Sequence, residues 1–150
     1  MRAAGLFRRV VKADVESLYP SIMLTYRIRP ITDTEDVFLP LLERLTKRRL
    51  DAKAQMRATD RQSDATDRQS VAASGAERAY WDGLQGSFKI LINSFYGYLG
   101  YAQANFNDYD AARQVTERGQ EIALRAVGLL EGRGAKILEV DTDGVYFVAP

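Results

Sequence analysis

The sequence predicts an α+β fold, because strand signals at the two ends of the chain flank a middle with helical periodicity. Residues 6–15 alternate their side chains with a period of two and are rich in valine, which is typical of a strand. Residues 136–150 contain two apolar runs around a turn sequence, the strongest hairpin signal in the chain. Between these ends, three segments repeat apolar residues at the spacing of an α-helix.

Composition limits the chemistry that is available. The chain has 150 residues, of which 46% are hydrophobic and 27% charged, so it is long enough for one domain with a real core. It has no cysteine and no histidine, which excludes disulfides, thiol nucleophiles and the commonest general base and zinc ligand. Any chemistry must therefore use carboxylates. Because no apolar run reaches membrane-spanning length and no signal-peptide stretch opens the chain, we expect a cytoplasmic protein without a membrane partner.

The first strand is expected to end near Asp14, which places this carboxylate at a strand terminus. In the segment that follows, SLYPSIMLTY, Pro20 suits the first turn of a short helix and Ser17 is a candidate N-cap. Arg29, Pro30 and the polar residues after them are expected to close this unit as a loop.

A second helix is predicted over residues 38–57, which carry leucines at helical spacing. Within it, residues 43–57 hold six basic side chains against two acidic ones, a local charge of +4 that the net charge of +1 conceals. A polyanion is therefore a plausible partner. The sequence ATDRQS then occurs twice, at 58–63 and 65–70, without a large apolar residue in either copy. We expect this repeat to form the polar tip of a helical hairpin and to have no chemical role.

The return helix, over residues 76–99, has one broad apolar stripe, while Lys89, Asn93 and Tyr96 share a narrow stripe on another face. One face can therefore pack while the other binds. A third long helix follows, with Asp108 or Asp110 as its N-cap. Its predicted buried stripe comprises Val115, Gly119, Ile122, Ala126, Leu129 and Leu130, with Gly119 marking the close approach of another segment.

Asp141 and Asp143 lie at the tip of the C-terminal hairpin, and the residues alone leave two interpretations of the DTDG sequence open. In the first, Asp-Gly simply provides the tight turn that a hairpin requires. In the second, the two acids join Asp14, at the end of another strand, to hold divalent cations. Mg²⁺ takes oxygen ligands and keeps waters or substrate phosphates, so a site of two or three carboxylates suits it.

Three blocks of sequence, in order, resemble motifs of the family B DNA polymerases. Residues 14–22 (DVESLYPSI) resemble the DxxSLYPSI block, residues 89–97 (KILINSFYG) the KxxxNSxYG block, and residues 141–144 (DTDG) the DTD block. The resemblance extends from about Gly5 to the end of the chain. At position 144 the family commonly has Ser, although Gly, as in this chain, also occurs there.

The resemblance implies the palm and fingers of a polymerase. Residues 1–35 and 100–150 correspond to the palm, an antiparallel sheet backed by a helix, and residues 36–99 to an inserted two-helix fingers hairpin. The exonuclease, amino-terminal and thumb domains of a parent polymerase do not fit in 150 residues, so the chain resembles a catalytic core fragment. If the source is bacterial or archaeal, the resemblance implies a nucleoid-associated protein.

The implied activity is that of a DNA-directed DNA polymerase, which adds deoxynucleotides to a primer 3′ end. The implied partners are primer–template DNA and deoxynucleotide triphosphates. The implied cofactors are two Mg²⁺ ions, for which Mn²⁺ can substitute, because two ions stabilise both the attacking and the leaving oxygens of nucleotidyl transfer. By resemblance, Asp14 and Asp143 are ligands of both metal ions, and the backbone carbonyl of Val15 is a further ligand. Asp141 is implied to lie closer to the outer coordination shell and to support the primer end.

The resemblance also implies residues that bind the incoming nucleotide. Arg49, Lys53 and Lys89 correspond to a triphosphate clamp, and the other implied contacts are the backbone amides of Ser17 and Leu18, a sugar-stacking Tyr19 that excludes a 2′-hydroxyl, and Asn93 and Tyr96 behind the nascent base pair. The alternatives are a solvated basic face for the cations and core packing for the tyrosines.

Two other functions compete with the polymerase. One is a non-catalytic structural or interaction fragment that keeps the motifs, and the other is a metal-dependent nuclease that uses the same acids. The presence of Lys89, Arg49 and Tyr19 favours the polymerase over the nuclease, because strand hydrolysis needs neither a triphosphate clamp nor a sugar gate.

Overall fold

The computed structural model describes residues 5–62 and 68–150. It divides into two compact units, which we call the sheet unit (Met1–Ile28 with Asp108–Pro150) and the hairpin unit (Arg29–Asn107). Residues 63–67 interrupt the ATDRQS repeat, so the predicted polar tip lies outside the described residues.

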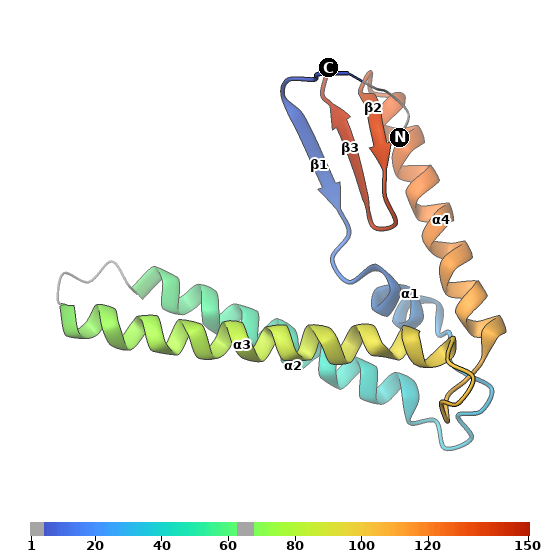
Figure 1. Cartoon of the computed structure of the whole chain (residues 1–150), viewed down its shortest axis with the longest axis horizontal. Coiled ribbons are helices and arrows are strands. Elements are labelled where there is room, and N and C mark those ends of the chain that lie inside the picture. The colour runs from blue at the N-terminus through green and yellow to red at the C-terminus, as the bar shows by residue number, and fades with distance from the viewer. Residues whose placement is uncertain (1–4, 63–67) are drawn as a thin grey trace. The chain divides into compact units, whose positions relative to one another are not determined.

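The sheet unit contains a three-stranded antiparallel sheet with the order β1-β3-β2 (Figure 1). Its strands are β1 (Val10–Asp14), β2 (Lys136–Val140) and β3 (Gly144–Val148). The local hairpin β2–β3 leaves one edge of β3 open, and β1 pairs with that edge, so the last strand of the chain is the central one. The predicted α+β class and the antiparallel sheet are confirmed.

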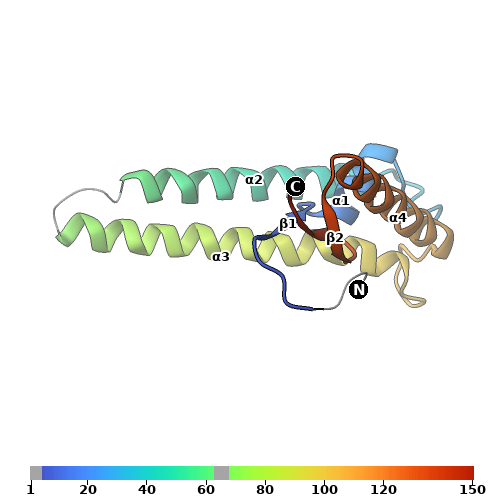
Figure 2. The same ribbon diagram turned by 90° about the horizontal axis from the view of Figure 1, so that it is seen from above.

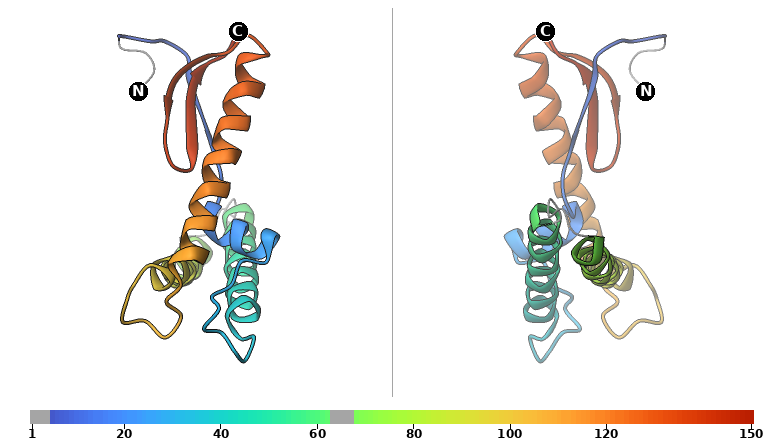
Figure 3. Two further views of the ribbon diagram at one scale, coloured as in Figure 1. Left: turned by 90° about the vertical axis from the view of Figure 1, so that its right-hand side faces the viewer. Right: turned by 90° about the vertical axis from the view of Figure 1, so that its left-hand side faces the viewer.

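Two helices complete the sheet unit, α1 (Leu18–Tyr26) and α4 (Tyr109–Glu131). Figure 3 shows α4 beside the β2–β3 hairpin, where its Val127 forms a buried cluster with Ile137 of β2 and Val145 of β3. The predicted helix behind the sheet is therefore present.

The first half of α4 packs against α1 instead. A Cβ atom at Gly119 would lie 3.4 Å from a ring carbon of Tyr19 and 3.7 Å from side-chain atoms of Leu18 and Ile22. This confirms the predicted close approach at Gly119. The predicted burial of Leu129 is wrong, since this side chain is 63% exposed. The buried face of α4 turns between its contact with α1 and its contact with the sheet, so a single straight stripe does not describe it.

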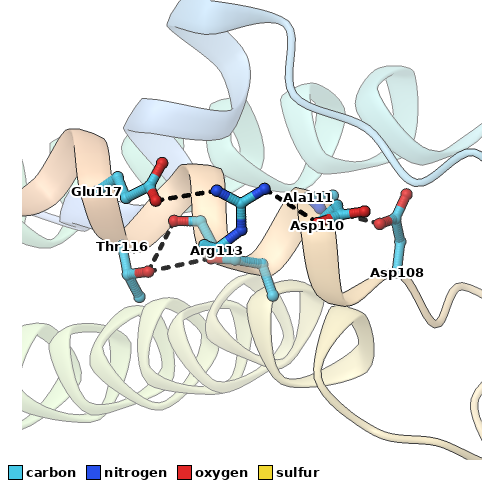
Figure 4. A network of polar contacts seen from close by, with 7 residues as sticks. Asp108, Asp110, Ala111, Arg113, Thr116 and Glu117 are labelled. Carbon is cyan, nitrogen blue, oxygen red and sulfur yellow. Dashed lines mark hydrogen bonds and ion pairs between the residues drawn. The ribbon is translucent and has the colours of Figure 1, made fainter.

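The two helix starts of the sheet unit differ. At α4, Asp108 is the N-cap and its carboxylate accepts a hydrogen bond from the backbone N–H of Ala111 at 2.9 Å (Figure 4). At α1, Ser17 occupies the N-cap position with φ of 54° and makes no side-chain capping bond. The prediction of a capping Ser17 side chain is wrong, because the left-handed backbone replaces the extended conformation that such a cap normally adopts.

The hairpin unit consists of α2 (Phe38–Gln62) and α3 (Arg68–Leu99), which pack along each other (Figure 2). Both predicted helices are present, and both extend further toward the tip than their apolar periodicity indicated. At the start of α2, the Phe38 ring packs at 5.0 Å from Phe95 and 5.4 Å from Phe106, measured between ring centres.

A buried carboxylate organises the entry to α2. Asp33 is 3% exposed and accepts backbone hydrogen bonds from Val37 and Phe38, both at 3.0 Å. These bonds satisfy N–H groups at the helix start, where no carbonyl of the helix is available. They also tie the segment around Asp33 to the start of α2, and the hairpin unit includes this segment.

Among the described helices, not one combines the length and the apolar character that a membrane span requires.

Candidate active site

The end of β1 meets the tip of the β2–β3 hairpin. Asp14, the last residue of β1, pairs in register with Gly144, the first residue of β3. The backbone N–H of Val15 donates to the carbonyl oxygen of Asp143 at 2.8 Å. Backbone pairing therefore brings Asp14 and Asp143 to adjoining strand ends, although they lie far apart in the sequence.

Asp141 lies on the other side of the turn. Its backbone N–H donates to the carbonyl oxygen of Gly144 at 2.8 Å, and its carboxylate accepts from the backbone N–H of Thr142 at 2.7 Å. Both interpretations of DTDG thus have support: the sequence forms the hairpin turn, and the turn presents exposed acids next to Asp14.

Gly144 sits in a crowded position. A Cβ atom there would lie 3.0 Å from Cε of Lys12, 3.2 Å from the Ala13 carbonyl oxygen and 3.2 Å from Oδ1 of Asp14. Such contacts are shorter than side-chain carbons normally tolerate, so a larger residue at this position requires Lys12 or the strand to move.

Lys12 is a residue of the site that sequence analysis missed. Its ammonium Nζ lies 3.3 Å from Oδ2 of Asp14 and 5.5 Å from the ring centre of Tyr146, its register partner on β3. The hydrogen bond to Asp14, reinforced by the charges of Asp14, Tyr146 and Asp143, raises the pKa of the Lys12 ammonium above its ordinary value of 10.5. The signal was available, because the period of two places residues 12 and 14 on one face of the strand.

Two cavities of the sheet unit adjoin the acids. The first, about 110 Å³, is lined by Asp14, Val15, Thr142 and Asp143 together with apolar residues of α4. The second, about 450 Å³, is lined by Tyr19 and Asp141 together with Thr116 and Gln120 of α4. The structure thus brings Tyr19 to the same cavity as one predicted acid. Sequence analysis did not single out the polar side chains of α4.

The donor set at the strand ends suits a hard cation. Asp14 and Asp143 supply two carboxylates, and Val15 adds a backbone carbonyl at the same strand end. Mg²⁺ is commonly bound through one or two carboxylates plus water and substrate phosphates, so this set is sufficient in kind. Within residues 5–62 and 68–150, no group of three or more acidic side chains gathers closely enough to hold an ion. Asp141 therefore does not complete a three-carboxylate cluster with the other two.

Two predicted nucleotide contacts lie at the start of α1. Ser17 precedes the helix and Leu18 is its first residue, so their backbone amides belong to the helix N-terminus. This end of a helix favours anions, because its N–H groups point outward and the helix dipole is positive there.

Apart from Tyr19 on α1, the other predicted nucleotide contacts belong to the hairpin unit. On α2, Arg49 is only 7% exposed and Lys53 is half-buried. On α3, Lys89 and Asn93 are exposed and Tyr96 is half-buried. The alternative interpretation, in which Arg49 belongs to a solvated basic face, does not agree with the burial of this side chain.

The fold of the chain is that of a known polymerase structure. The structure resembles that of the family B DNA polymerase from Pyrobaculum calidifontis, with a TM-score of 0.71 and 21% identity, over 99% of this chain and 21% of that one. A sequence model described as DNA polymerase family B matches residues 31–144. The chain belongs to DNA polymerase family B.

Sequence relatives extend the match beyond that range. The chain is 32% identical to DNA polymerase 1 of Pyrococcus abyssi over 97% of its own length and 20% of that protein. It is also 32% identical to DNA polymerase II of Escherichia coli, over 95% of its own length and 18% of that protein. The chain thus spans about a fifth of these relatives.

Proposed function

We propose that this chain forms the palm and fingers of a DNA-directed DNA polymerase and carries the residues for two-metal nucleotidyl transfer to a primer 3′ end. The observation that carries the proposal is the backbone hydrogen bond from Val15 to Asp143, which joins two family motifs at one end of the strands of the sheet. Family membership supplies the reaction class, and the paired acids supply the chemistry that such a reaction needs.

Asp14 and Asp143 would hold the divalent cations, either Mg²⁺ or Mn²⁺, with the carbonyl oxygen of Val15 as a further ligand. When bound, the ions neutralise charge on the triphosphate and stabilise the attacking and leaving oxygens. Asp141 adds negative charge beside this site and supports the primer end. Its location at the second cavity, rather than in a three-acid cluster, is consistent with such an outer role.

Arg49, Lys53 and Lys89 would bind the triphosphate of the incoming nucleotide. The local charge of +4 over residues 43–57 supports this role, since it attracts an anionic substrate. The amides of Ser17 and Leu18 add an anion-binding helix terminus.

Tyr19 would contact the sugar and exclude a 2′-hydroxyl by collision, while Asn93 and Tyr96 lie behind the new base pair. Gly119 supports the role of Tyr19, because a Cβ atom at this position of α4 would already be in van der Waals contact with the tyrosine ring, at 3.4 Å. A ring held in this way cannot easily move aside for an extra hydroxyl group.

The proposed substrates are primer–template DNA and deoxynucleotide triphosphates, and the proposed location is the cytoplasm or nucleoid. Because the chain spans about a fifth of its relatives, we propose that exonuclease, amino-terminal and thumb domains complete the parent enzyme. Duplex affinity comes mainly from phosphate contacts spread along the DNA, many of which a thumb supplies. The 150-residue chain alone should therefore extend primers poorly.

A non-catalytic role is the second candidate. The observation that favours it is the ion pair between Lys12 and Asp14, which engages one of the two metal-binding carboxylates. In such a chain, the family motifs would stabilise the fold without binding an ion.

A primer-extension assay separates the two candidates. The parent polymerase, with Mg²⁺ or Mn²⁺ and deoxynucleotides, is compared with its Asp143→Ala variant and with Glu139→Ala, which removes a charge from β2 of the same sheet. The polymerase proposal expects extension by the parent and by Glu139→Ala only. Equal extension by all three would exclude a metal-binding role for Asp143, and no extension by the parent would favour the non-catalytic role.

A further inference from the structure

The strongest feature that the proposed reaction leaves unused is the lysine beside the metal-binding acid. Lys12 and Asp14 lie on one face of β1, and their Nζ and Oδ2 atoms are 3.3 Å apart. We infer that Lys12 is a built-in competitor of the divalent cation, an ammonium held at Asp14 that lowers the metal affinity of the site. This inference rests on the proposed metal site at Asp14 and Asp143.

Three structural features direct the lysine to this position. The period of two on β1 sends both side chains to the same face of the strand. The absence of a side chain at Gly144 leaves room for the Lys12 stem, whose Cε lies 3.0 Å from where a Cβ atom would be. The ring of Tyr146 flanks the ammonium at 5.5 Å and attracts it. The glycine at 144 and the lysine at 12 therefore belong to one arrangement.

Charge explains why the ammonium and a metal ion compete. Both are cations that need the carboxylate oxygens of Asp14, and an ion bound there would repel an ammonium a few ångströms away. Asp143 adds to the attraction for either cation, since its charge also acts on Lys12. A bound ion must therefore displace Lys12 or tolerate its repulsion.

The size of the effect follows from exposure. The side chains of Lys12 and Asp14 are 39% and 50% exposed, and ion pairs at such positions are weak and screened by salt. The lysine should therefore reduce metal affinity by about three- to tenfold without abolishing binding. The opposite change in metal affinity is equally measurable. If Lys12 instead relieves repulsion between Asp14 and Asp143, its removal weakens metal binding.

The test is a titration of the chain with Mn²⁺ alone, with free Mn²⁺ measured by electron paramagnetic resonance at low ionic strength. Lys12→Met is compared with Lys136→Met, which removes the same charge from a lysine that packs over the ring of Phe7. We expect Lys12→Met to lower the dissociation constant about three- to tenfold and Lys136→Met to change it less than twofold. Added salt should shrink the difference.

A second variant tests the path of the lysine. Gly144→Ser places atoms where the Lys12 stem lies, and also 3.2 Å from Oδ1 of Asp14, so it is made both alone and together with Lys12→Met. Displacement of the lysine should make Mn²⁺ binding tighter relative to the unsubstituted chain than the same serine does in the Lys12→Met background, provided that circular dichroism shows a native fold. Lys12→Gln, which keeps a polar chain of similar length, repeats the charge test if Lys12→Met is unstable.

The outcomes separate this inference from the metal site itself. If Asp143→Asn abolishes binding while Lys12→Met leaves it unchanged or weakens it, the metal site stands and the inference about Lys12 is overturned. If neither the unsubstituted 150-residue chain nor its Lys12→Met variant binds Mn²⁺ saturably, the metal site and the inference about Lys12 are both overturned.

Discussion

The backbone N–H of Val15 donates to the carbonyl oxygen of Asp143 at 2.8 Å, which joins the end of β1 to the tip of the β2–β3 hairpin. Because this bond is between main-chain atoms, it does not depend on the carboxylate of either neighbouring acid. Substitution of Asp14 or Asp143 should therefore remove chemistry while leaving the sheet intact. This separation of scaffold and function allows the acids to be tested without unfolding the protein.

Asp14→Asn and Asp143→Asn in the parent polymerase should each reduce the rate of primer extension by about 1,000-fold. A metal ion supplies several kcal/mol of transition-state stabilisation, and each 1.4 kcal/mol corresponds to about a factor of ten. Single-turnover extension gives the rate, and thermal melting of the 150-residue chain should remain within a few degrees of the parent sequence. Glu139→Gln serves as the control for loss of an acidic residue from the sheet. A rate loss below tenfold would remove these acids from the metal site.

Tyr19→Ala in the parent polymerase should relax discrimination against ribonucleotides about tenfold or more, because a collision that excludes the 2′-hydroxyl disappears. The measurement is the ratio of kcat/KM for a ribonucleotide and the matching deoxynucleotide. Tyr26→Ala, which removes an aromatic ring 45% exposed from the same helix, should leave this ratio unchanged. An unchanged ratio in Tyr19→Ala would assign this tyrosine to packing alone.

Gly119→Leu should destabilise the sheet unit by about 1–3 kcal/mol, because the new side chain must push against Tyr19, Leu18 and Ile22. Urea unfolding of the chain measures the loss. Gly128→Leu is the matched control on the same helix, since no atom beyond the adjoining residues and the backbone of the helix itself lies within 4 Å of the Cβ position there. The control should be neutral or slightly stabilising, because leucine favours a helix more than glycine does. Equal stability of the two variants would contradict the close packing of α1 and α4.

Asp33→Ala should destabilise the hairpin unit by about 1–3 kcal/mol, since it leaves the backbone N–H groups of Val37 and Phe38 without their acceptor. Asp33→Asn keeps one acceptor oxygen and should cost less. Asp36→Asn removes the charge of an acid whose side chain is 63% exposed and keeps a residue type that tolerates the left-handed backbone at this position (φ 53°), so it should change the free energy of unfolding by no more than about 0.5 kcal/mol. Urea denaturation that ranks the three variants otherwise would refute a buried cap at Asp33.

Local signals in the sequence predicted the helices and the hairpin correctly, since each depends on residues close in the chain. Asp108 caps α4 as its residue type suggests, and Gly119 marks a real contact. The signal at Ser17 failed because backbone conformation, and not residue type, decides whether a side chain can cap.

Features that depend on contacts between distant segments of the chain were harder to predict from the sequence. The pairing of Lys12 with Asp14 follows from strand periodicity, but the room that Gly144 leaves for it depends on the register between β1 and β3. The burial of Arg49 likewise could not be predicted, because a place in a basic run does not reveal which of its side chains lie away from solvent. The exposure of Leu129 depends on the two different partners of α4.

We propose above that Asp14 and Asp143 together bind the divalent cation of nucleotidyl transfer. The most direct measurement is anomalous X-ray scattering from crystals of the chain soaked with Mn²⁺ and a deoxynucleotide triphosphate. We expect a manganese peak within about 2.5 Å of carboxylate oxygens from both residues, with Lys12 displaced from Asp14. Manganese bound elsewhere in the crystal, with both carboxylates free of metal and Lys12 still paired to Asp14, would contradict it.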